Sequence, residues 1–191
     1  DGAGGNDTLF GGAARDFLHA GAGDDVVFGE GGDDWITGGL GADTIDAGDG
    51  ADGMDAGAGD DLIHGGAGND WVNANDGDDR IFGDDGDDAL EGRAGDDTIS
   101  GDAGNDYLVG NEGSDTYRFG RGDGIDTLNN LGSDASSTDR LVFDPDIASD
   151  QLWFSQSGNA LRIQIIGTSD NIYVSDWYSD TDKRIDAVEA A

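Results

Sequence analysis

The chain has 191 residues, of which 43 are acidic and 9 are basic, so its formal net charge is −34 at pH 7. This balance excludes nucleic acid as a partner, because phosphate binding needs clustered Lys and Arg, and it disfavours an anionic membrane surface. Cysteine is absent, which rules out disulfides and thiolate metal sites. No run approaches the ~18 apolar residues of a membrane span. Without a counter-charge, 36 glycines and this self-repulsion are typical of an unfolded chain.

From the N-terminus, an aspartate recurs at every ninth residue. Glycine lies two residues before each one, with Ala14 as the exception, and an apolar side chain lies two residues after it. A period of nine held in phase over residues 2–118 predicts a repeat architecture. The aspartates are Asp7, Asp16, Asp25, Asp34, Asp43, Asp52, Asp61, Asp70, Asp79, Asp88, Asp97, Asp106 and Asp115.

Each unit is numbered so that this aspartate is position 6, as in residues 65–73 around Asp70. Positions 1 to 5 are small or polar and rich in glycine, which favours a turn. Positions 7 to 9 alternate outward, inward and outward, which is the period of a short strand, with the position-8 aliphatic as the sole inward side chain. We predict two units per coil of 18 residues, stacked as parallel strands about 4.8 Å apart. The core is only two aliphatic rows thick, so we expect bound ions to supply stability.

The repeated carboxylates form a ladder of hard oxygen ligands, which suits Ca²⁺, and each ion would cancel two charges. Asp occupies position 6 every time, although Asn or Ser would serve if the side chain only capped a turn. We therefore predict calcium ligands. The second acidic residues, at position 5, are interpreted as solvated neighbours rather than ligands: Asp24, Asp33, Asp60, Asp78, Asp87 and Asp96.

These units resemble the RTX (repeats-in-toxin) family, whose signature is GGxGxDxUx, over residues 2–118. The resemblance implies an all-β, right-handed parallel β-roll with calcium between bends 18 residues apart. One bend would contribute its position-6 Asp and the carbonyls of positions 2 and 4, and the next its Asp and the carbonyls of positions 1 and 3. Odd and even units then give at most about eleven ions. The implied carbonyl donors include Gly21, Gly23, Gly38, Gly39, Gly41, Gly57, Gly59, Gly65, Gly66, Gly68, Gly83, Gly86, Gly92, Gly95, Gly101 and Gly104.

Some units depart from the pattern. Ala14 and Arg15 in the second unit predict a weak or empty site, and Gly53 with Met54 predicts loose packing in the sixth. Where another residue replaces the position-2 glycine, the carbonyl ligand survives and only backbone strain is expected. The replacements noted are Asn75, Asp84, Arg93, Asp102 and Asn111.

Position 7 of the even units gives an outward stripe of aromatic side chains, broken by Gly53 and Ala89. Its aromatic members are Phe17, Trp35, Trp71 and Tyr107. Exposed aromatic patches mark contact surfaces. Two interpretations remain open: packing against the C-terminal segment or a neighbouring domain, and docking of a glycan or protein partner.

After Arg118 the nine-residue frame stops and glycine becomes scarce. Residues 129–138 are predicted to form a loop. The alternating runs 139–143, 151–155, 160–166 and 171–177, separated by turn residues, predict a small antiparallel β unit that caps the last coil. We thus expect an RTX β-roll over 2–118 and a C-terminal β cap over 119–191.

Within this cap, the runs 139–143 and 150–155, with Gly167 and residues 176–179, resemble the haemolysin-type calcium-binding-related domain. That resemblance implies secretion by a type I system that reads a C-terminal signal. Whether residues 184–188 belong to the signal stays open.

The chain begins in frame with a repeat and without Met, so we expect it to be part of a longer protein. No catalytic triad or pair of catalytic carboxylates stands out, and we predict no enzyme. The favoured function is a calcium-binding module of a secreted or cell-surface bacterial protein. It would fold on binding calcium after type I export, as part of a surface or biofilm adhesin. The alternative is the tail of an extracellular protease, lipase or polysaccharide-modifying enzyme.

Overall fold

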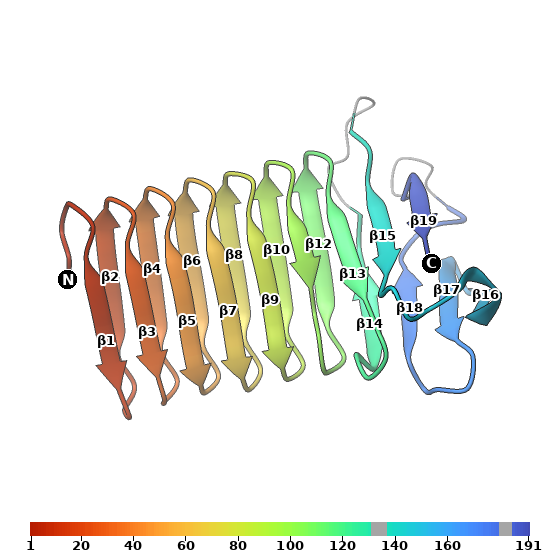
Figure 1. The fold of residues 1–191 in the computed structure, drawn as a ribbon, viewed down its shortest axis with the longest axis horizontal. Helices are drawn as coiled ribbons and strands as arrows, with labels where there is room; N and C mark the ends of the chain where they lie inside the picture. The colour runs from red at the N-terminus through yellow and green to blue at the C-terminus, as the bar shows by residue number, and fades with distance from the viewer. Residues whose placement is uncertain (131–136, 180–184) are drawn as a thin grey trace.

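The computed structural model describes residues 1–130, 137–179 and 185–191, which form a long solenoid of two sheets (Figure 1). Successive units alternate between the sheets, so each coil adds one strand to each of them. The first sheet has the order β1-β3-β5-β7-β9-β11-β13-β15-β19 and the second the order β16-β17-β18-β14-β12-β10-β8-β6-β4-β2. Chain order is order along the axis from the red N-terminal coil up to β14 and β15 (Figure 1), whereas the later strands of the second sheet follow β14 in the order β18, β17, β16.

The strands of the first sheet are β1 (Thr8–Gly12), β3 (Val26–Glu30), β5 (Thr44–Asp49), β7 (Leu62–Ala67), β9 (Arg80–Asp85), β11 (Thr98–Ser100), β13 (Thr116–Phe119), β15 (Arg140–Phe143) and β19 (Ala187–Glu189). Those of the second are β2 (Phe17–Ala22), β4 (Trp35–Leu40), β6 (Gly53–Ala58), β8 (Trp71–Asp76), β10 (Ala89–Ala94), β12 (Tyr107–Glu112), β14 (Ile125–Leu128), β16 (Leu152–Ser157), β17 (Ala160–Ile165) and β18 (Asn171–Val174). A 3₁₀ helix, η1 (Ser149–Gln151), precedes β16.

Most strands in the repeat region are longer than expected, because they run from position 7 through position 3 of the next unit. Neighbours pair in parallel with a shift of 18 residues, as Trp35 does with Gly53. Most glycines at position 4 adopt positive φ, such as Gly41 at 121°, which lets the chain turn sharply between strands. The predicted parallel roll with 18 residues per coil is confirmed.

The core is a double row of aliphatic side chains. Ile36, Ile45 and Ile63 at position 8 are fully buried, as predicted. The expectation of one inward side chain per unit was incomplete, because most strands continue past position 9 and turn position 1 inward as well. Alanine or glycine occupies most of those positions, and the alanines are fully buried: Ala20, Ala47, Ala56 and Ala74. Met54 is also fully buried, and the expectation of loose packing in its unit stays a prediction.

Both sheets continue beyond Arg118. β15 pairs in parallel with β13, and β18 pairs in parallel with β14. Strands β16, β17 and β18 form the predicted antiparallel unit. The run 139–143, however, was wrongly placed in that unit, because β15 belongs to the first sheet. Residues 131–136 of the expected loop and Arg184 lie outside the described residues, and the division of the chain at residue 118 stays a prediction.

Candidate metal centres

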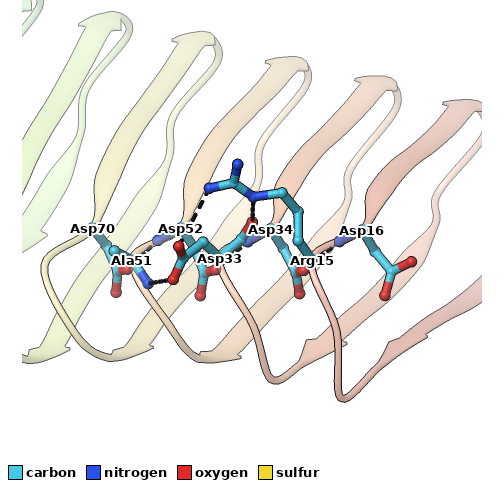
Figure 2. A network of polar contacts seen from close by, with 7 residues as sticks. All are labelled: Arg15, Asp16, Asp33, Asp34, Ala51, Asp52 and Asp70. Carbon is cyan, nitrogen blue, oxygen red and sulfur yellow. Dashed lines mark hydrogen bonds and ion pairs between the residues drawn. The ribbon is translucent and has the colours of Figure 1, made fainter.

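The position-6 aspartates form two rows, one along each edge of the roll, which we call the aspartate ladder. In each step the Oδ1 atom accepts a hydrogen bond from the main-chain N–H of the aspartate one coil earlier. Figure 2 shows three such steps, in which Asp16 donates to Asp34, Asp34 to Asp52 and Asp52 to Asp70, over 2.7–2.8 Å. The bond fixes each carboxylate in the bend from which it comes.

The second carboxylate oxygen, Oδ2, is buried and has no hydrogen-bond partner along nearly the whole ladder. A buried anionic oxygen without a donor is costly unless a cation is nearby. These oxygens therefore fit a metal ion between the bends. They belong to Asp7, Asp25, Asp34, Asp43, Asp52, Asp61, Asp70, Asp79, Asp88, Asp97, Asp106, Asp115 and Asp126.

Main-chain carbonyls approach the same space. A Cβ atom at Gly65 would lie 2.6 Å from Asp70 Oδ2 and 2.7 Å from the carbonyl oxygen of Gly83, the position-1 glycine of the next coil. A side chain there would fill the space that the two oxygens border, which explains the small residues at position 1. The carbonyl at position 3 already accepts one hydrogen bond. At Ala58, for example, this carbonyl accepts the N–H of Gly41 over 2.8 Å. It offers a ligand only its second lone pair.

In the described ranges, no three side chains of His, Asp or Glu converge on one point. Each bend supplies one buried carboxylate, so the remaining ligands must be carbonyl oxygens. An all-oxygen set that is mostly carbonyl and carries few charges suits Ca²⁺ better than a softer metal.

Burial destabilises the charged form of the ladder carboxylates. Burial, together with the charge of neighbouring carboxylates, which contributes less, raises the pKa of Asp97 to about 8 and that of Asp61 to about 7. The pKa of Asp70 rises to about 6 for the same reasons. A divalent cation would reverse this effect, because it favours the ionised form of the groups that it contacts.

The position-5 acidic residues have a structural role that the sequence did not reveal. Their Oδ1 atoms accept the main-chain N–H of position 5 in the next coil, as Asp24 does from Ala42 over 3.1 Å. The same contact is made by Asp33, Asp60, Asp78, Asp87 and Asp96. These exposed carboxylates form a second hydrogen-bonded row outside the aspartate ladder, with the opposite direction.

Arg15 occupies position 5 of the first even unit, at the start of that outer row. Its Nε donates to the Asp33 carbonyl oxygen over 2.9 Å and its Nη2 lies 3.3 Å from Asp33 Oδ2 (Figure 2). Asp16, in the same unit, is only partly buried and lacks the combination of burial and no hydrogen-bond partner that characterises Oδ2 along the ladder. The prediction of a weak site in this unit stays a prediction, and both features agree with it.

The ladder continues past the last predicted aspartate. Asp126 accepts the N–H of Asp106 over 3.1 Å, and Asp139 accepts that of Asp115 over 3.0 Å. Sequence reasoning missed both because they follow at 20 and 24 residues instead of 18. The local pattern was a usable signal, since each aspartate precedes a buried leucine by two residues, as in a regular unit: Leu128 and Leu141.

The two ends of the ladder differ. Asp126 Oδ2 is buried and unpartnered, whereas Asp139 Oδ2 accepts a hydrogen bond from Asn130 Nδ2 over 2.8 Å. One coil further, Ile172 occupies the register position of Asp126. The row of Asp126 thus ends at an apolar side chain, whereas the row of Asp139 continues, because the Asp139 N–H donates to Oδ2 of Asp186 over 2.9 Å.

Residues that replace glycine at position 2 all adopt positive φ, as expected for strained positions. The values are 81° for Asn75, 68° for Asp84, 88° for Arg93, 59° for Asp102 and 76° for Asn111. Glu30, at 72°, belongs to the same group.

Fold and site together define a class: a parallel β-solenoid whose bends offer oxygen ligands to a hard cation. The model of the RTX calcium-binding nonapeptide repeat matches residues 1–36, 28–63, 55–90, 82–117 and 91–128. The chain belongs to this family, whose repeats bind calcium.

Among solved structures, the chain is similar to the extracellular lipase LipA from Serratia marcescens. Identity is 18% and the TM-score is 0.43, over 97% of this chain and 38% of the lipase. The chain thus corresponds to well under half of the lipase's length, and so distant a likeness says nothing about its activity. In the described part of this chain, no helix is long and apolar enough to cross a membrane.

Proposed function

We propose that calcium ions bind between successive bends of the roll and that their binding folds the chain. The observation that carries this proposal is the row of buried Oδ2 atoms without a partner. Without a cation, the folded roll would hold these carboxylates out of water at a large cost. With a net charge of −34 and a core two side chains thick, the metal-free chain is expected to stay unfolded.

The proposed ligands are the thirteen predicted aspartates, the carbonyls of the position-1, 2 and 4 glycines, and Asp126. Seven odd and six even units give eleven gaps, and Asp126 adds one between itself and Asp106. The gap next to Asp16 is expected to bind weakly. We place no ion against Asp139, because Asn130 already satisfies its second oxygen.

A chain that folds only with calcium suits export. Extracellular calcium modules bind with a Kd of about 10⁻⁴ to 10⁻³ M, so the chain would remain unfolded in a calcium-poor cytoplasm and fold outside the cell. We propose a secreted or surface-exposed bacterial protein that leaves by a type I system, with an adhesin as the parent. The tail of an extracellular enzyme remains the second candidate. An HExxH or GxSxG motif in the rest of the protein would decide for it.

Circular dichroism of the metal-stripped chain tests the folding proposal. We expect the spectrum of a disordered chain, converted to β-structure by millimolar-range calcium but not by magnesium, which demands a tighter octahedral site. Stable sheet in the metal-stripped chain at neutral pH would contradict it.

Isothermal titration calorimetry tests the ligands. Asp70→Asn keeps an oxygen for the Asp52 N–H but loses the charge, and should lower the number of bound ions. Asp16→Asn is the matched control and should change it little, because Asp16 lacks the buried free oxygen. Equal effects of the two substitutions would argue against the assignment.

A further inference from the structure

Two departures from the repeat meet at one place on the second sheet. Arg15 occupies position 5 of the second unit and Gly53 occupies position 7 of the sixth, yet both line one hollow of about 510 Å³. We call it the tryptophan hollow; the residues that matter are Arg15, Asp33, Trp35, Gly53, Asn69 and Trp71. It lies on the predicted aromatic stripe, whose side chains are exposed.

The apolar wall of this hollow is a pair of stacked indoles. Trp35 and Trp71 lie on strands separated by β6, and their ring centroids are 5.7 Å apart with planes 16° from parallel. Gly53 makes this possible, because a Cβ atom there would lie 2.5 Å from Trp35 Cε3. The two residues remain 44% and 39% exposed, so much of the aromatic surface is open to a ligand.

The rim is polar and held in place. Arg15 is bound to Asp33 through two of its nitrogens, which leaves further N–H donors on the guanidinium (Figure 2). The side-chain oxygen of Asn69 accepts the N–H of Asp87 over 3.1 Å, so the donors that Asn69 offers are its amide hydrogens. Donors and a carboxylate acceptor thus stand beside the aromatic wall.

The C-terminal segment contacts the stripe at Tyr107, whose hydroxyl accepts a hydrogen bond from Asn129 Nδ2 over 2.7 Å, but the described C-terminal strands do not pack on the two tryptophans. β16 and β2 lie at opposite ends of the second sheet, and β18 joins the sheet at β14. The C-terminal strands therefore extend the sheet along its axis and do not cover β4 and β8. Packing against a neighbouring domain stays open.

The shape and charge of the hollow restrict its ligand. Its volume is within the range of small-molecule sites, whereas a protein partner commonly covers about 800 Å² of each surface. Anionic ligands are disfavoured by Asp33 and by the net charge of −34. An aromatic wall beside hydrogen-bonding groups suits a ring with an apolar face and a rim of hydroxyls. We propose that the tryptophan hollow binds a sugar ring of a pyranose polymer without negative charge.

A second hollow favours a polymer over a single sugar. It measures about 200 Å³, shares Trp71 with the first, and is also lined by Ala89, Glu91 and Tyr107. The small Ala89 opens a gap between two aromatic side chains next to a carboxylate. Neighbouring rings of one chain could therefore lie along the roll axis on either side of Trp71.

This proposal rests on the proposed function, because the folded roll brings the two tryptophans together. The test is calorimetry at saturating calcium with cellohexaose, chitohexaose, its deacetylated form, and polygalacturonate as the anionic control. We expect binding of at least one uncharged or amino-sugar oligomer and none of polygalacturonate. Tighter binding of the deacetylated form would assign the ligand to cationic polysaccharides.

Three variants locate the site. Trp35→Ala with Trp71→Ala should weaken binding roughly hundredfold, about tenfold for each ring. Gly53→Ala keeps both rings but displaces Trp35, and should weaken binding about tenfold. The matched control is Phe10→Ala with Phe28→Ala, which removes a pair stacked at 5.2 Å on the first sheet and should leave binding unchanged.

Circular dichroism of each variant in calcium separates the two proposals. If the chain folds with calcium but binds none of the uncharged or amino-sugar oligomers, or binds them equally well after loss of both tryptophans, the saccharide site is refuted. Binding of polygalacturonate alone would refute the site as well. A chain that is folded without calcium would refute the proposed function and leave the saccharide result valid.

Discussion

The N–H of Asp106 donates to Oδ1 of Asp126 over 3.1 Å, the same contact that joins Asp88 to Asp106 over 2.8 Å. Twenty residues separate the first pair and eighteen the second. The bend geometry is therefore kept although the repeat frame is lost, and the ladder gains a further carboxylate at its C-terminal end.

Asp126→Asn should lower the number of bound calcium ions by one, because the amide keeps an acceptor for Asp106 but not the free charged oxygen. Asp139→Asn should leave the number unchanged and cost roughly 1–3 kcal/mol of stability, because it disturbs the hydrogen bond from Asn130. Calorimetry measures the number of bound ions, and urea unfolding in calcium measures the free energy of unfolding. An ion lost on substitution of Asp139 would show that the hydrogen bond from Asn130 does not exclude calcium there.

The metal-free chain should gain structure on acidification. Aspartate in an unfolded chain has a pKa near 3.9, whereas burial raises the pKa of Asp97 to about 8 and of Asp70 to about 6 in the roll. Folding therefore takes up protons. The metal-free roll is most stable below pH 4 and loses stability as pH rises through about 6 to 8.

A pH titration of the metal-stripped chain, followed by circular dichroism, checks this sign. Calcium binding at pH 7 should also release protons, which calorimetry in buffers of different ionisation enthalpy detects. More β-structure at pH 8 than at pH 4.5 without metal would contradict the burial of these carboxylates.

The thin core should tolerate little loss of volume. Ile63→Ala removes a fully buried side chain and should cost about 2–5 kcal/mol in saturating calcium. Leu62→Ala is the control at the preceding residue, whose side chain is only partly buried. It should lower the free energy of unfolding clearly less. Chemical denaturation compares the two. Similar costs would mean that calcium binding, rather than packing, sets the measured stability.

Relief of backbone strain should stabilise the roll. Glu30 has φ of 72°, so Glu30→Gly should raise the free energy of unfolding by roughly 1 kcal/mol. Glu30→Ala removes the same charge but retains a Cβ atom, and should give little gain. If both variants gain equally, reduced charge repulsion and not the backbone is the cause.

The sequence alone determined the roll, because its information is local and periodic. The interval from Asp61 to Asp70 sets the bends, and the small and aliphatic residues between them set the strands. The sequence could not place Asp126 or Asp139 in the ladder, nor β15 in the first sheet. Inserted residues there change the spacing from 18, although the strands still pair in parallel.

Only the tertiary structure showed which oxygens are free. Asp126 and Asp139 look equivalent in the sequence, yet Asn130 satisfies the second oxygen of Asp139 and not that of Asp126. Likewise Arg15 and Gly53 are 38 positions apart and reach one hollow because strands β2 and β6 flank β4. Contacts between coils depend on which residues of successive coils lie side by side. The nine-residue period determines this register only where it is unbroken.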